Sequence, residues 1–207
     1  MKKSIFVLLT AAMMLFAVSA YAGDGKMMLG IKAGLDMANL TGDDVSDTSI
    51  KMGAVGGAFM CYKVTDLVAI QPEVLFAMKG AKWDSAGYEV NYKINYIEIP
   101  VLLKVLLPTE GKIKPALYAG PAIGILMSSK ASNGEEVDMK DETKSTNFSL
   151  VAGAALGYQL EKGAIFAEAR YDVGLATIGK TEDDVDGEEP SIKTSDIMVM
   201  VGYAFPF

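Results

Sequence analysis

The chain has 207 residues, a formal net charge of −7, one cysteine and no histidine. The absence of histidine excludes Ser-His-acid and Cys-His catalysis and every histidine-containing zinc site, although two-carboxylate hydrolases remain open. The acidic balance argues against nucleic acid and anionic lipid as partners, and the single cysteine, Cys61, is expected as a small buried hydrophobe rather than part of a disulfide framework.

Residues 1–22 have the layout of a secretory signal peptide. Lys2 and Lys3 precede an apolar stretch over residues 5–18, and Ala20 and Ala22 are the small residues of a cleavage site before Gly23. The alternative is an uncleaved membrane anchor, but the apolar run is shorter than the ~18 residues that a spanning helix needs. Cleavage would leave one domain, residues 23–207, whose net charge is −9 because the signal carries two lysines and no acidic residue.

Alternation of apolar and polar residues dominates the chain after residue 26. It predicts about eight strands, near residues 27–39, 51–64, 67–80, 88–106, 113–129, 145–161, 163–175 and 192–207. Each is long enough to cross a bilayer as a tilted strand, which takes ~9–11 residues. Eight is also the smallest number typical of outer-membrane barrels.

The connections between these strands alternate between short and long. The short ones cover residues 64–66, 107–112 and 160–163, and the longer polar ones cover 41–50, 80–87, 129–144 and 178–191. In an up-and-down meander this pattern places every tight turn at one end and every long loop at the other, as in outer-membrane barrels. The fold class predicted is therefore all-β, a closed antiparallel up-and-down transmembrane β-barrel of about eight strands.

A soluble lipocalin-like barrel has the same period of two, with its apolar face turned inward. Four features favour the membrane form: the export signal without disulfides, the segregated loop lengths, the glycine, alanine and charged residues that share a face, and the aromatic C-terminus. With lipid outside, the stretch YIEIPVLLKV at residues 96–105 has an apolar row on the lipid face. Glu98, Pro100 and Lys104 then face the interior, where charge can be paired or hydrated.

The apolar parity of this strand changes at Tyr96-Ile97, since residues 88, 90, 92, 94 and 96 are apolar before it. A β-bulge combined with projection of residues 88–95 above the membrane is the favoured explanation, and projection alone is the alternative.

Charged residues on the predicted inward faces form one candidate site. This set comprises Lys32, Glu73, Glu98, Lys104, Glu168, Arg170 and Asp172. It could line a narrow polar conduit. A salt-bridged plug is favoured, because the interior of an eight-stranded barrel is just wide enough for its own side chains and buried charges of both signs usually pair.

Two stretches carry a family resemblance. YIEIPVLLKV at 96–105 and YAGPAIG at 118–124 resemble the PorT-like outer membrane protein β-barrel domain family, often labelled porin family. The resemblance extends from Gly30 to Phe207. It implies an eight-stranded barrel surrounded by lipid in the outer membrane of a Gram-negative cell. For PorT itself it also implies a link to a protein-secretion apparatus.

The C-terminus resembles the aromatic assembly signal of outer-membrane proteins. Tyr203, Phe205 and Phe207 share one parity, which implies the barrel-assembly machinery as a partner; an ordinary apolar strand end is the alternative.

The acidic stretch 181–190, with Asp43, Asp44 and Asp47, could offer oxygen ligands to Ca²⁺, but its spacing does not match a calcium loop and a solvated acidic loop is favoured. No metal and no cofactor are expected.

The leading functional hypothesis is a non-enzymatic barrel with a largely filled lumen. Its role would be structural or interactive, through acidic extracellular loops and a protein partner at these loops or at the periplasmic turns. The alternatives are a narrow channel for ions or small solutes and an accessory part in protein secretion. An envelope enzyme ranks last, because histidine is absent.

Overall fold

The structure is a computed structural model that describes residues 26–206, apart from residues 44, 46–47, 86–87, 134 and 181–190. The predicted signal peptide, the acidic stretch 181–190 and the terminal Phe207 lie outside the described residues. In the part of the chain described, no helix is both long and apolar enough to cross a membrane.

Nine strands make up the described fold. Their bounds are β1 Met27–Thr41, β2 Thr48–Lys63, β3 Val68–Ser85, β4 Tyr88–Leu106, β5 Ile113–Ser132, β6 Glu136–Asp138, β7 Thr146–Leu160, β8 Gly163–Gly174 and β9 Lys193–Pro206. Eight of them match the predicted segments, and the predicted strand pattern is confirmed. The ninth, β6, has three residues and pairs with residues 130–132 at the C-terminal end of β5.

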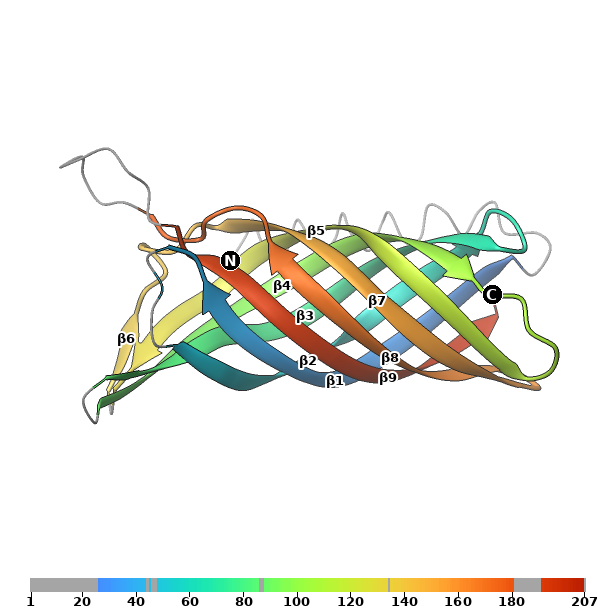
Figure 1. Cartoon of the computed structure of the whole chain (residues 1–207), viewed down its shortest axis with the longest axis horizontal. Helices are drawn as coiled ribbons and strands as arrows, with labels where there is room; N and C mark the ends of the chain where they lie inside the picture. The colour runs from blue at the N-terminus through green and yellow to red at the C-terminus, as the bar shows by residue number, and fades with distance from the viewer. Residues whose placement is uncertain are drawn as a thin grey trace.

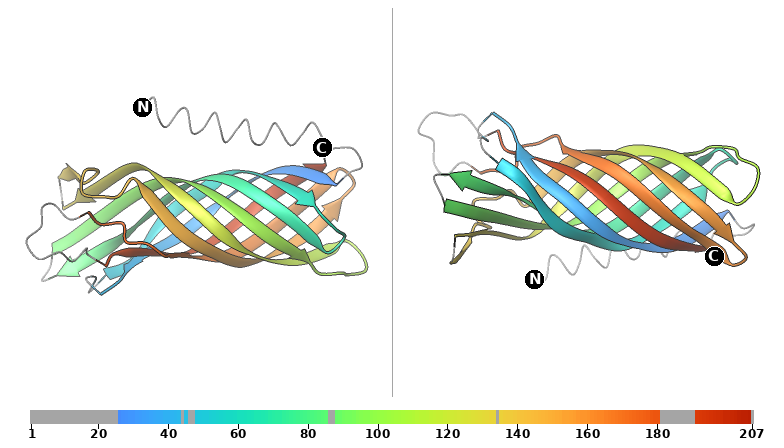
Figure 2. Two further views of the ribbon diagram at one scale, coloured as in Figure 1. Left: turned by 90° about the horizontal axis from the view of Figure 1, so that it is seen from above. Right: turned by 60° about the horizontal axis from the view of Figure 1, so that its bottom comes forward.

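The eight long strands close into an antiparallel barrel. The sheet order is β4-β3-β2-β1-β9-β8-β7-β5-β6, and an additional β4–β5 pairing joins the two ends of the sheet. Figures 1 and 2 show the strands winding around one axis, with β6 at one end. Closure leaves no free edge among these strands, so their backbone groups pair within the barrel wall.

The apolar row of each strand points outward. Ile31, Leu35 and Val199 are exposed, and Val201 is 64% exposed, the largest value among the outward apolar side chains. Their sequence neighbours Lys32, Asp36 and Met200 are buried. This orientation is the one expected of a barrel whose outer surface contacts acyl chains, and it excludes the lipocalin-like alternative.

Aromatic side chains are exposed near both ends of the outer surface. Tyr62, Tyr158 and Phe205 lie toward the short turns, while Phe148 and Tyr171 lie toward the loops. The Tyr203 and Phe205 rings stack with centroids 6.3 Å apart.

One predicted connection is wrong. Residues 80–87 were expected to form a long polar loop, but β3 and β4 continue to Ser85 and from Tyr88, so two residues separate the strands. Gly80, the first residue of the predicted loop, lies within β3, opposite Lys93, with a φ of 129° that favours glycine.

The predicted bulge requires a correction as well. The register between β4 and β5 shifts between Asn95 and Tyr96, but the extra residue is Met127 of β5. The register of β4 with β3 does not shift. Ile94 and Tyr96 therefore share the inward face with Glu98. The apolar pattern changes because β4 turns its apolar side chains into the barrel near the loop end.

Candidate functional site: the charged interior of the barrel

The interior carries many charged side chains. They come from β1, β2, β3, β4, β8 and β9, at inward positions where the strand period places every second residue. Most of these charges fall into two groups, which lie at different heights along the barrel axis, while Lys51 of β2 donates to the Lys79 carbonyl oxygen at 3.1 Å.

The turn-side group consists of Lys32, Glu73, Glu168 and Arg170. The Lys32 Nζ lies 2.7 Å from Glu73 Oε1 and 2.7 Å from Glu168 Oε1, and Arg170 Nη1 donates to Glu73 Oε2 at 2.9 Å. Two cations face two carboxylates, so the group is neutral when all four are ionised. Arg170 is only 2% exposed, and its Nε also contacts the Met198 sulfur at 3.4 Å.

The loop-side group consists of Lys79, Glu98, Asp172 and Asp196. The Lys79 ammonium contacts all three carboxylates, at 2.5 Å from Glu98 Oε1, 2.8 Å from Asp172 Oδ2 and 2.7 Å from Asp196 Oδ2. One cation therefore holds three buried carboxylates, which leaves an excess of two negative charges when all are ionised. A lysine can do this because its ammonium has three donors.

Of the seven residues that the sequence placed in the lumen, the structure puts six into these two groups. The seventh, Lys104, lies closer to the turn end, where its Nζ donates to Gln71 Oε1 at 3.1 Å. Gln71 in turn donates to Glu73 Oε1 at 2.7 Å.

Sequence reasoning left out Lys79 and Asp196, although Lys79 is the centre of the loop-side group. Its parity gave a signal, since Lys79 follows Gln71 and Glu73 on the same face of β3. Asp36, which shares the inward face of β1 with Lys32, was also left out. It is fully buried, and neither of its oxygens has a hydrogen-bond partner among the described residues.

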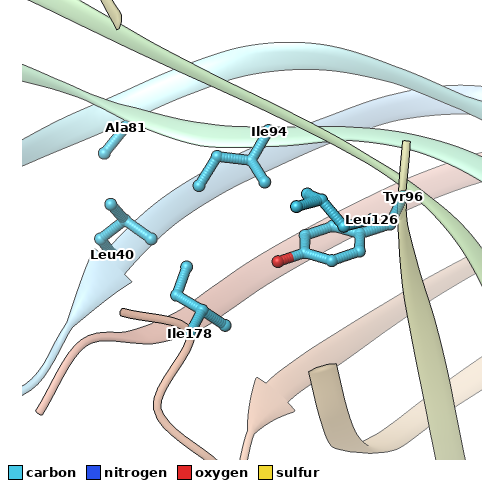
Figure 3. Packing of buried hydrophobic residues seen from close by; sticks show 6 residues of the cluster. All are labelled: Leu40, Ala81, Ile94, Tyr96, Leu126 and Ile178. Atoms are coloured by element: carbon cyan, nitrogen blue, oxygen red, sulfur yellow. The ribbon is translucent and has the colours of Figure 1, made fainter. Parts of the chain in front are cut away.

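Apolar clusters pack beside the charged groups. One consists of Val55, Leu75, Ala77, Met198 and Met200, of which Leu75 and Ala77 lie between Glu73 and Lys79 on the inward face of β3. At the loop end a second cluster points into the barrel and consists of Leu40, Ala81, Ile94, Tyr96, Leu126 and Ile178, with Val45 and Ile192 against it (Figure 3). Ile178 comes from the connection between β8 and β9, so this segment covers part of the loop-end opening.

The carboxylates of the two groups are held by lysine and arginine. Among the described residues there is no group of three or more Cys, Asp or Glu side chains that could hold a metal ion.

Comparison with known proteins places the fold. The profile of a family described as outer membrane protein beta-barrel domain matches residues 21–179, more than three-quarters of the chain. Among solved structures, Neisserial surface protein A is similar with a TM-score of 0.55 and 12% identity, over 90% of this chain and 100% of that one. OprG, an outer membrane protein of Pseudomonas aeruginosa, is similar with a TM-score of 0.54 and 11% identity, over 87% of this chain and 95% of that one. No curated protein sequence matches the chain.

Proposed function

The chain belongs to the outer membrane protein beta-barrel domain family, and we propose that it is a closed, non-enzymatic barrel of the Gram-negative outer membrane that acts through its external loops. Its interior serves as a structural plug, and its loop end is the surface available to partners.

The observation that carries this proposal is the pairing inside the lumen. Six ion pairs of 2.5–2.9 Å cross the interior between buried side chains, and apolar clusters pack beside them. An ion that entered would have to break these contacts, and breaking a buried pair leaves an uncompensated charge at a cost of about 3–5 kcal/mol. The lumen is thus better suited to hold the strands together than to conduct.

The loop end supports an interactive role. β6 forms a hairpin extension on β5, and the segment around it exposes Glu135, Asp138, Asp141 and Glu142, besides Glu136, which pairs with Lys93 and Lys130. The stretch 181–190, TEDDVDGEEP, adds further acidic residues by sequence. Such a surface favours a basic protein partner and opposes contact with anionic lipid headgroups.

Planar-bilayer recording tests the closed barrel. Purified protein inserted into a bilayer is expected to give no large, steady conductance. A control variant, Arg170→Gly with Glu73→Gly, removes two plug side chains and is expected to raise conductance. Large, steady current from the unaltered protein would contradict the proposal and favour a channel for ions or small solutes.

An accessory role in protein secretion rests on the resemblance to PorT-like chains alone. Deleting the gene and measuring the export of secreted proteins tests it, since unchanged export would remove the role.

A further inference from the structure

A cavity of about 370 Å³ lies inside the barrel at its turn end. The exposed turn residues Asp66, Leu67, Pro108 and Thr109 form its mouth. Its inner limit is buried Gln71, which is bonded to Glu73 of the turn-side group. The plug therefore closes the cavity toward the loops, and the volume lies within the ~300–1,000 Å³ typical of small-molecule sites.

The walls of the cavity are mainly apolar. Phe59 and Phe166 line it with their rings edge to face, 5.4 Å apart, and Ala116, Ala155 and Leu106 also lie in the wall. Gly202 of β9 lies directly opposite Phe166 of β8. It leaves room for the Phe166 ring, because a Cβ at Gly202 would meet that ring. A hydrocarbon chain placed in the cavity would gain about 25 cal/mol for each Å² of apolar surface removed from water.

One half-buried cation lies in this apolar wall. The Lys104 ammonium donates to Gln71 Oε1 at 3.1 Å and lies 6.0 Å from the centre of the Phe166 ring. The amide nitrogen of Gln71 is already used by Glu73. Among the residues the structure describes, no carboxylate forms an ion pair with Lys104, whereas Lys32, Lys79 and Arg170 all have one.

The net charge around the mouth of the cavity is positive, like that of Lys104. Lys63 and Lys114 line the cavity together with Lys104, and Asp66 is the acidic residue of the lining. Three cations and one carboxylate give a local excess of two positive charges in a protein that is acidic overall. This local field attracts anions to the turn end.

From these features we propose that the cavity binds an amphipathic monocarboxylate, that is, an unbranched acyl chain of medium length. The hydrocarbon tail packs against Phe59, Phe166 and Ala155, and the carboxylate accepts hydrogen bonds from Lys104. The site opens to the periplasmic side and is separate from the loop surface, so it adds a ligand to the proposed function without depending on it.

Equilibrium binding of radiolabelled decanoate to the folded protein in phosphatidylcholine nanodiscs tests the site. The decanoate bound by empty nanodiscs is subtracted as background. Decanoate is expected to saturate one site per barrel. Decanol, which has the same tail without the charge, and butyrate, which has the charge without the tail, are each expected to compete at least tenfold less well. Failure of decanoate to exceed the empty-nanodisc background would overturn the proposal.

Variants locate the site. Lys104→Ala is expected to weaken decanoate binding about tenfold or more, whereas Lys162→Ala, which removes a turn-end lysine outside the cavity lining, leaves it unchanged. Ala155→Phe fills the cavity and is expected to abolish binding, with heat-modifiable gel mobility showing that each variant is folded. Unchanged affinity in folded Lys104→Ala or Ala155→Phe would place decanoate elsewhere and overturn the assignment.

The buried thiol of Cys61 supplies a second readout, because it lines the same cavity. Decanoate is expected to slow its modification by a small water-soluble thiol reagent at least fivefold in the unaltered protein and in Lys162→Ala, but not in Ala155→Phe.

Discussion

Asp172 on β8 and Asp196 on β9 lie directly opposite each other inside the barrel, and the Lys79 ammonium lies within 2.8 Å of both carboxylates. Like charges at opposed positions on neighbouring strands destabilise a sheet. Here the two strands can pair because a lysine from β3, across the lumen, offsets the repulsion. The ion pairs thus link parts of the wall that the backbone ladder does not connect directly.

Lys79→Met should therefore be strongly destabilising. It leaves Glu98, Asp172 and Asp196 buried without their shared cation, and the expected loss is about 3–5 kcal/mol of the free energy of unfolding. Urea titration of the barrel in lipid measures this loss, with the folded fraction at each urea concentration read from heat-modifiable gel mobility.

Combining Lys79→Met with Asp172→Asn and Asp196→Asn removes most of the unpaired charge and should recover part of this loss. Lys162→Met, at an exposed turn, should change stability by no more than about 0.5 kcal/mol. A loss of less than about 1 kcal/mol for Lys79→Met would show that the loop-side group does not hold the strands together.

Gly202 and Gly124 both face the interior but differ in the space around them. A Cβ at Gly202 would meet the Phe166 ring and lie 2.5 Å from the Ile31 carbonyl oxygen, whereas the nearest atom to one at Gly124 is 3.2 Å away, on the Tyr96 ring. Gly202→Ala should therefore cost about 1–3 kcal/mol and Gly124→Ala less. Urea midpoints measure the difference, and equal costs would contradict the packing described for the turn end.

The β5–β6 hairpin should depend on pH through Glu136. Hydrogen bonds from Lys130 and then Lys93 hold the pKa of this exposed carboxylate below its ordinary value of 4.5, and the bond to Glu136 raises the pKa of Lys130 above 10.5. A carboxylate whose pKa is lowered on folding stabilises the hairpin above pH 4.5, and this stabilisation is lost as the pH falls through the folded pKa. A lysine whose pKa is raised on folding stabilises the hairpin below pH 10.5, and this stabilisation is lost as the pH rises through the folded pKa.

Between these limits the hairpin should be most ordered. Amide hydrogen exchange of residues 136–138 should accelerate, relative to the barrel strands, below pH 4.5. Glu136→Gln should remove this pH dependence. Protection that does not change below pH 4.5 would contradict the role of these pairs.

The fold was predictable because its pattern is local. A period of two, strand lengths near those of a tilted membrane strand and segregated turns can all be read along the chain. The errors arose where tertiary context overrides local signals. Residues 80–85 were expected in a loop but belong to β3, and the bulge expected in β4 is an extra residue, Met127, in β5.

The charged interior was predictable as a face but not as a set of partners. Parity placed Glu73, Glu98 and Asp172 on inward faces, yet which lysine meets which carboxylate depends on strand tilt and on how the barrel closes. Lys79 on β3 reaches Asp172, 93 positions along the chain, and no spacing rule connects them. The apolar cluster at the loop end was hidden for the same reason, because its members come from distant segments.

Cysteine accessibility at Ala77 tests the filled interior most directly. Ala77 is fully buried on the inward face of β3, between Glu73 and Lys79, so Ala77→Cys adds one sulfur atom to the buried interior beside the loop-side group. In a Cys61→Ser background, the folded variant in lipid should resist a water-soluble thiol reagent until it is unfolded. Val137→Cys on exposed β6 should react at once. Rapid modification of Ala77→Cys in the folded barrel would show that water reaches the middle of the lumen and would contradict the account.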